Sequence, residues 1–120
     1  MSSAAGRFGY PNRGPYATVK WGLLGFMKTL AMELGAHNIR ANAILPGAVD
    51  GDRIQGAFQG HAEATGRSLD EIKAEAMSNQ SLQYMVDPRD IAALAVFLAS
   101  DAAKSISGQT LPIDGDMQRN

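Results

Sequence analysis

The sequence predicts an α/β domain whose strands run parallel. Two observations lead to this prediction. A long apolar helix is followed, after a short polar turn, by an apolar strand, which is half of a right-handed strand–helix–strand unit. A second helix with one apolar face precedes another short strand near the C-terminus. Because two strands are too few for a stable parallel sheet, we expect these elements to be the C-terminal part of a larger sheet.

The first predicted elements are a loop and a long helix. Residues 1–15 are rich in glycine and proline, which predicts the end of a strand followed by an irregular loop. Residues 16–35 are apolar on nearly all sides, so we expect a helix that is buried on more than one face. Gly22 and Gly25 lie inside this helix, where each costs about 1 kcal/mol relative to alanine, and we interpret them as sites of close backbone approach. The apolar positions at helical spacing are Val19, Leu23, Phe26, Met27, Leu30, Ala31 and Leu34.

A strand and a polar segment follow. Residues 39–45 read as a strand that ends at Pro46-Gly47. Residues 52–65 predict a weakly patterned helix, and a capping box at Ser68 predicts another that runs to about Gln80. Few apolar residues anchor this polar stretch, approximately residues 50–85. Its composition fits equally well a mobile flap over a binding site or an ordinary helical hairpin on the surface.

The last predicted elements are a helix and a strand. Asp87 and Pro88 give the start signal of a helix that runs to about Ala99 with one apolar face. A turn follows, and residues 110–113 predict a short strand that ends at Asp114-Gly115.

The composition excludes several functional classes. The chain has 120 residues, 45% of them hydrophobic, and a formal net charge of −1, which gives no argument for binding nucleic acid or an anionic membrane. It has no cysteine, so disulfides and thiolate chemistry are excluded, and we expect a cytoplasmic location. No apolar run is long enough to span a bilayer. Neither histidine has a partner at metal-ligand spacing, so no metal site is predicted.

Tyr16 and Lys20 are the first candidates for chemistry. They stand four residues apart at the start of the predicted helix, so both side chains leave the same face one turn apart. A nearby ammonium stabilises a phenolate, which favours proton transfer by the phenol near neutral pH. The same spacing also occurs by chance on ordinary helices. Ser3 precedes Tyr16 by thirteen residues, and its hydroxyl could hold a carbonyl or alcohol oxygen beside the phenol.

Four sequence blocks together resemble a known family. They are Ser3, then Tyr16-x-x-x-Lys20, then Asn42-x-x-x-Pro46-Gly47, then Ser107-Gly108 leading to Ile113-Asp114-Gly115. Their order and spacing resemble the short-chain dehydrogenase/reductase family over nearly the whole chain. The resemblance implies the C-terminal part of a Rossmann-type, doubly wound parallel sheet. The family's glycine-rich pyrophosphate turn is absent, so we expect residues 1–120 to be a single partial domain whose N-terminal nucleotide-binding half is missing.

The resemblance also implies roles for individual residues. Tyr16 looks like the catalytic acid/base, and Lys20 like the lysine that assists it and binds the nicotinamide ribose. Ser3 resembles the serine that orients the substrate oxygen, and its neighbour Ser2 is a rival whose spacing is one residue too long. Both Tyr16 and Lys20 therefore count as catalytic and as cofactor-binding residues.

The cofactor expected from the resemblance is NAD or NADP. Pro46, Gly47 and Val49 resemble the family segment that lies along the nicotinamide. Many members have a threonine four residues beyond the glycine, where this chain has Gly51, which has no hydroxyl to offer the carboxamide. The residue that chooses between NAD and NADP lies outside the matching blocks.

We therefore expect an NAD(P)-dependent oxidoreductase, of the short-chain alcohol dehydrogenase or ketoreductase type, that acts on a secondary alcohol or a ketone. The resemblance implies a homo-oligomer, a dimer or tetramer, with the helix of residues 16–35 in a subunit contact, and residues 50–85 as substrate loop and lid helices. The alternative is a truncated, non-catalytic remnant of the family that cannot bind nucleotide alone and acts only through subunit association. We expect the 120-residue fragment by itself to be inactive.

Overall fold

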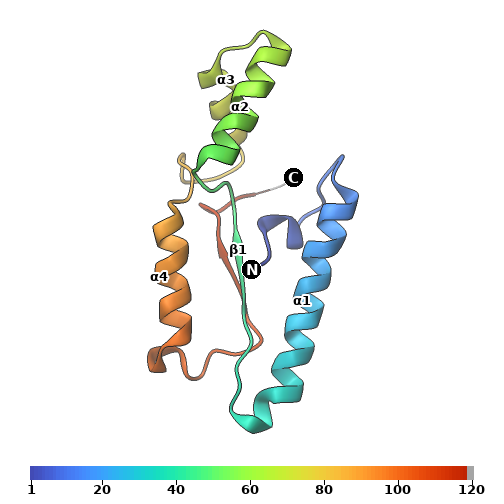
Figure 1. Ribbon diagram of the computed structural model, residues 1–120, viewed down its shortest axis with the longest axis vertical. Coiled ribbons are helices and arrows are strands. Elements are labelled where there is room, and N and C mark those ends of the chain that lie inside the picture. The colour runs from blue at the N-terminus through green and yellow to red at the C-terminus, as the bar shows by residue number, and fades with distance from the viewer. Residues whose placement is uncertain (119–120) are drawn as a thin grey trace.

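Two short parallel strands lie at the centre of the structure, a computed structural model that describes residues 1–118 (Figure 1). Strand β1 (Ala43–Pro46) pairs with β2 (Thr110–Ile113), with Ala43 opposite Thr110 and Pro46 opposite Ile113. Helix α1 (Gly14–Leu34) runs along one side of the strands and α4 (Pro88–Ala99) along the other. The other elements are α2 (Asp52–Thr65), α3 (Leu69–Met77) and the 3₁₀ turns η1 (Ala4–Gly6), η2 (Gly35–His37) and η3 (Asp101–Ala103).

The core is split by β1 into two clusters. Successive side chains of a strand point to opposite faces. Ala43 and Leu45 therefore pack with Met27 of α1, while Ile44 packs with Leu98 of α4 and with Ala103 of η3. This arrangement covers both faces of β1, as a parallel strand requires. The α/β prediction with parallel strands is confirmed in the described chain.

Helix α1 differs from its prediction in burial. Only Met27 is buried among its residues, and Val19, Phe26 and Met32 are 61%, 62% and 85% exposed. Within residues 1–118, α1 packs against β1, η1 and η2, and Lys28 donates to the Gly108 carbonyl, so the second face that was expected to be buried is exposed in the single chain. A Cβ added at Gly22 or Gly25 would meet no atom of another element within 4 Å, so no backbone among residues 1–118 approaches these two glycines closely.

Helices α2 and α3 form a hairpin at one end of the long axis of a molecule that measures 56 × 28 × 24 Å (Figure 1). The capping box at Ser68 is confirmed, and its hydrogen bonds lower the pKa of the Glu71 carboxyl. Helix α3 ends at Met77, earlier than predicted. The base of the hairpin is held by Val86, whose N–H donates to Ala48 and whose carbonyl accepts from Asp50.

Helix α4 and strand β2 match their predicted bounds. Asp87 caps α4 by accepting from the Arg89 N–H at 2.8 Å. Strand β1 begins at Ala43 rather than Ile39. Just before it, the Asn42 side chain makes hydrogen bonds to the segment that precedes β2. Its amide donates to the Ile106 carbonyl at 2.8 Å and accepts from the Gln109 N–H at 3.0 Å.

The N-terminal turn η1 joins α1 to β1. The Ser2 N–H donates to the Ile44 carbonyl at 2.9 Å, and the Ser2 hydroxyl donates to the Lys20 carbonyl at 2.8 Å. Gly6 allows this approach, because a Cβ there would lie 2.8 Å from the Ser2 Oγ and 3.0 Å from the Lys20 carbonyl oxygen. The turn therefore fits against α1 only while residue 6 has no side chain.

Gly6→Ala and Gly22→Ala should change stability in opposite directions. A methyl group at position 6 collides with Ser2 and α1, so we expect the free energy of unfolding to fall by about 1–3 kcal/mol. At position 22 the methyl group meets open space in mid-helix, so a gain of up to about 1 kcal/mol is expected. Urea denaturation of both variants of the complete protein measures this, and equal effects would contradict the tight packing of η1.

Candidate active site

The first turns of α1 place Tyr16 and Lys20 side by side. Pro15 occupies the start of the helix, where its missing N–H costs nothing. The Lys20 Nζ lies 5.5 Å from the centre of the Tyr16 ring, within the range of a cation–π contact. The Tyr16 residue is 39% exposed. The two side chains predicted to act together therefore share one helix face, and that face is open to solvent.

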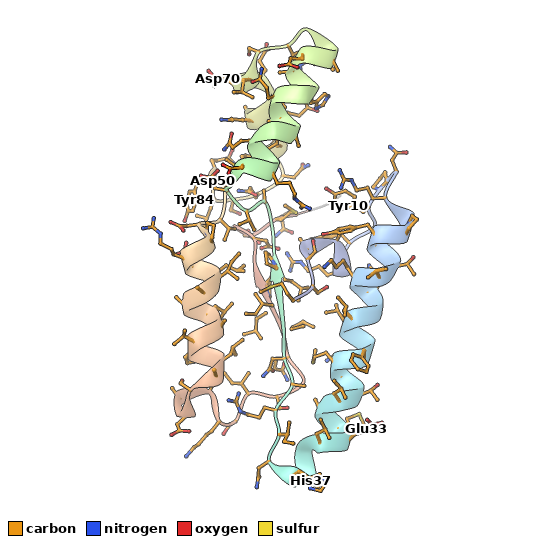
Figure 2. The ribbon with its side chains drawn as sticks, viewed as in Figure 1. Tyr10, Glu33, His37, Asp50, Asp70 and Tyr84 are labelled. Carbon is orange, nitrogen blue, oxygen red and sulfur yellow. The ribbon has the colours of Figure 1, made fainter. Side chains whose placement is uncertain are left out.

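Tyr10 also lies at this site, although the sequence analysis did not single it out. Its ring meets the Tyr16 ring edge-on, with centroids 6.5 Å apart and planes at 67°. Figure 2 shows Tyr10 in the loop beside the N-terminal end of α1. The loop is held to the helix at Trp21, whose indole N–H donates to the Phe8 carbonyl at 3.4 Å. An irregular loop has no periodicity, so no sequence signal placed Tyr10 here.

The two serines ahead of α1 have different surroundings. Ser2 is buried, and its hydroxyl is occupied by the Lys20 carbonyl. Ser3 is half-buried, and its Oγ accepts from the Ala5 N–H at 3.2 Å as the cap of η1. Within residues 1–118 no hydrogen bond from the Ser3 hydroxyl is found. Of the two serines, Ser3 is therefore the one whose hydroxyl can still donate a hydrogen bond to a ligand.

Pro46 is the last residue of β1, and Gly47 and Val49 follow its carboxyl end. The Gly47 N–H donates to the Ile113 carbonyl at 3.0 Å, and Val49 forms an isolated bridge with Val86. A Cβ at Gly47 would lie 2.8 Å from the Asp114 Cα, so this turn packs directly against the end of β2. Ligands of open α/β sheets bind outside the carboxyl ends of the strands, which is where these three residues lie.

An ion pair joins η1 to the end of β2. The Arg7 Nη2 lies 2.8 Å from the Asp114 Oδ2 and donates to the Met117 carbonyl at 3.0 Å. The side chain of Asp114 is only 4% exposed, whereas that of Arg7 is 34% exposed. The sequence analysis used Asp114 only as the end of a strand, and 107 positions separate the two partners.

A separate cleft lies between the starts of α2 and α4. It has a volume of about 510 Å³, and its lining includes Asp50, Asp52, Asp87 and Arg89 but none of the predicted catalytic residues. Hydrogen bonds from Arg89 lower the pKa of the Asp87 carboxyl, and the same pairing raises the pKa of Arg89. Asp87 is therefore held as a carboxylate and caps a helix.

Residues 1–118 contain no group of three or more His, Cys, Asp or Glu side chains arranged to hold a metal ion. None of the helices in this range is both long and apolar enough to cross a membrane. His37, one of the two histidines, lies at the far end of α1 from Tyr10 (Figure 2).

Comparison with known sequences gives matches over almost the whole chain. A family model described as enoyl-(acyl carrier protein) reductase matches residues 1–118. A 3-oxoacyl-(acyl-carrier-protein) reductase FabG from Chlamydia muridarum is 38% identical over 117 residues, which cover 98% of this chain and 43% of that protein. Trans-4-hydroxycyclohexanecarboxylate dehydrogenase from Sinomonas cyclohexanicum is 36% identical over 115 residues, which cover 96% and 38%. The chain thus spans about two fifths of the length of these relatives.

Solved structures share the fold. A short chain dehydrogenase family protein from Francisella tularensis superposes with a TM-score of 0.89 at 33% identity, over 95% of this chain and 47% of that one. A 4-hydroxyisoleucine dehydrogenase complexed with NADH gives a TM-score of 0.73 at 32% identity, over 96% and 43%. An actinorhodin polyketide ketoreductase with NADPH gives 0.85 at 25% identity, over 95% and 44%.

Ser2→Ala should destabilise the protein, because Ser2 holds η1 against α1. Loss of the buried hydrogen bond to the Lys20 carbonyl is expected to lower the free energy of unfolding by about 1 kcal/mol. The control is Ser105→Ala, an exposed position where a change within about 0.5 kcal/mol is expected. Chemical denaturation of both variants measures the difference, and a Ser2→Ala protein as stable as the control would exclude this anchoring role.

Proposed function

The chain belongs to the short-chain dehydrogenase/reductase family, and from this we propose that the protein is an NAD(P)-dependent oxidoreductase acting on a secondary alcohol or a ketone. The observation that carries the proposal is the pairing of Lys20 with the exposed Tyr16, with Nζ 5.5 Å from the ring centre. Relatives complexed with NADH and with NADPH support a nicotinamide cofactor. The ketoreductases and dehydrogenases among the relatives support alcohol or ketone substrates.

In this proposal Tyr16 is the general acid/base. When a ketone is reduced, its oxygen gains negative charge and needs a proton, which the phenol donates. When an alcohol is oxidised, the phenolate accepts the alcohol proton. The exposed ring of Tyr16 leaves its hydroxyl accessible to a substrate, and Tyr10 supports the ring on one side. The positive charge of Lys20 stabilises the phenolate that remains after proton donation.

Ser3 has the role of orienting the substrate in this proposal. Its hydroxyl proton is donated to no residue within the described range, so it can bind the substrate oxygen. A hydrogen bond of this kind strengthens as negative charge develops on the oxygen in the transition state. Ser2 is unsuited to the role because its hydroxyl is buried against the Lys20 carbonyl.

The residues at the carboxyl end of β1 fit a nicotinamide cofactor. Gly47 lies at the carboxyl end of β1, where a Cβ would come within 2.8 Å of the Asp114 Cα, so the turn packs directly on the end of β2. Pro46, Gly47 and Val49 would lie along the nicotinamide, and the Lys20 ammonium would bind the ribose hydroxyls. When bound, the cofactor supplies or accepts the hydride, whereas the protein contributes position and proton transfer.

The proposal also includes the assembly and the lid. Exposed apolar side chains on α1, such as Val19 and Phe26, support a homo-oligomer, either a dimer or a tetramer, with α1 in the subunit contact. The α2–α3 hairpin stands beside the carboxyl end of β1 and is held there at Val86, which supports a role for residues 50–85 as a substrate lid.

Tyr16→Phe in the complete protein should lower kcat by about 100-fold or more, because the substrate oxygen loses its proton donor. Cofactor binding should remain close to that of the unmodified protein, since the aromatic ring is retained. Steady-state kinetics and fluorescence titration with NADH or NADPH measure the two quantities. Tyr10→Phe is the matched control, because it keeps the ring that packs on Tyr16, and turnover retained by Tyr16→Phe would end the assignment.

Lys20→Met should weaken cofactor binding by about tenfold, because charge-assisted hydrogen bonds to the ribose hydroxyls are lost. It should also lower kcat, because the charge that develops on the Tyr16 oxygen during proton transfer loses a neighbouring ammonium. Fluorescence titration with NADH or NADPH and steady-state kinetics measure the two quantities. Lys28→Met is the control on the same helix, where the ammonium donates to the Gly108 carbonyl. Unchanged cofactor binding and kcat in Lys20→Met would refute the role proposed for Lys20.

A further inference from the structure

We infer that Arg7 is a positioning residue, which fastens the turn carrying Ser3 to the C-terminal segment of residues 114–117 and thereby sets where the Ser3 hydroxyl lies. The inference rests on the proposed function, because it concerns the serine that orients the substrate there. It assigns to Arg7 no contact with substrate or cofactor.

The ion pair of Arg7 with Asp114 is required by burial. A carboxylate that is 4% exposed is costly to hold without a counter-charge. Arg7 is the one cation that forms an ion pair with Asp114 within residues 1–118, at 2.8 Å. The same guanidinium nitrogen donates to the Met117 carbonyl at 3.0 Å, so the contact fixes direction as well as distance.

The other end of the Arg7 contact is the turn η1. Ser3 caps this turn at its start, and Arg7 ends it, donating its N–H to the Ala4 carbonyl at 3.0 Å. The Gly6 N–H donates to the Ser3 carbonyl at 2.8 Å. Ser3 and Arg7 are therefore the two ends of one hydrogen-bonded turn, and a displacement of Arg7 moves Ser3. Ser2 anchors the same turn from the other side.

Residues 114–117 are themselves held by two other parts of the chain. Asp114 packs against Gly47, the turn proposed to lie along the nicotinamide. The Gly115 carbonyl accepts from the Leu82 N–H at 3.0 Å, which joins the segment to the base of the α2–α3 hairpin. Figure 1 shows the N-terminal turn beside β1, close to this carboxyl end of the sheet. Through Arg7, the Ser3 turn is placed relative to both the cofactor segment and the proposed lid.

The expected consequence is catalytic. A reacting group displaced by about 1 Å can lower the rate by about 100-fold. Arg7→Met keeps the length of the side chain but removes its charge and its donors, so we expect kcat to fall by about 10- to 100-fold. KM for the substrate should change much less, because the pocket itself is intact. Arg7→Lys, which keeps the positive charge opposite Asp114, should recover part of the loss and should also remain folded if Arg7→Met does not.

The decisive measurement is a double-mutant cycle with Ser3→Ala in the complete protein. If Arg7 acts through Ser3, Arg7→Met in the Ser3→Ala background should cost less than about twofold in kcat. A merely structural role predicts the same loss in both backgrounds, and that result would overturn the inference. Arg89→Met is the control. It removes a guanidinium from the ion pair with Asp87, where the Arg89 side chain is 90% exposed, so kcat of this variant should be unchanged. Unchanged kcat in both Arg7 variants would also overturn the inference.

Hydrogen exchange separates this inference from the proposed function, because it requires no activity. Arg7→Lys should speed exchange of the Gly6 and Leu82 amides, the first within η1 and the second bonded to the segment of residues 114–117. Arg89→Met should leave both amides unchanged. If Tyr16→Phe retains full turnover while these amides exchange faster, the proposed function fails and the positioning contact stands. If Tyr16→Phe is inactive while exchange in Arg7→Lys is unaltered, the positioning inference alone fails.

Discussion

The burial of β1 on both of its faces is the constraint on which the rest of the structure depends. Leu45 is buried against α1, and Ile44 is buried against α4. Parallel strands are covered on both sides because their connections place helices on both faces. This packing fixes where α1 runs, and therefore where Tyr16 and Lys20 lie. It also presents the Ile44 carbonyl to Ser2, which brings η1 to the same place.

The candidate site depends on contacts that fasten the turn η1 to α1 and to the end of β2. Ser2 joins η1 to α1, and Gly6 permits the contact because it has no side chain. At the other end of the turn, Arg7 neutralises the buried Asp114. The candidate catalytic groups Ser3, Tyr16 and Lys20 remain at least partly accessible between these anchors. Rigid anchors beside accessible groups are what a preorganised polar site requires.

The starts of helices that carry a capping signal were predicted correctly, whereas the burial of α1 was not. Ser68 and Asp87 marked the starts of α3 and α4, because a helix cap bonds N–H groups only two or three residues away. In the single chain α1 is less buried than its apolar pattern predicts, since such a pattern indicates what a helix can bury and not which elements cover it. Strand β1 begins later than predicted, because the Asn42 side chain bonds to residues more than sixty positions later.

The sequence by itself determined that Tyr16 and Lys20 share a helix face, that the strands are parallel, and which family the blocks resemble. The shared face follows from helical geometry, the parallel strands follow from the order of helices and strands, and the resemblance follows from the residue types of the four blocks and their order. Only the tertiary structure decided that Ser2 is an anchor and Ser3 is accessible, that Tyr10 supports Tyr16, and that Arg7 pairs with Asp114. The ion pair spans 107 positions and depends on how β1 brings the two ends of the chain together, which no local pattern records.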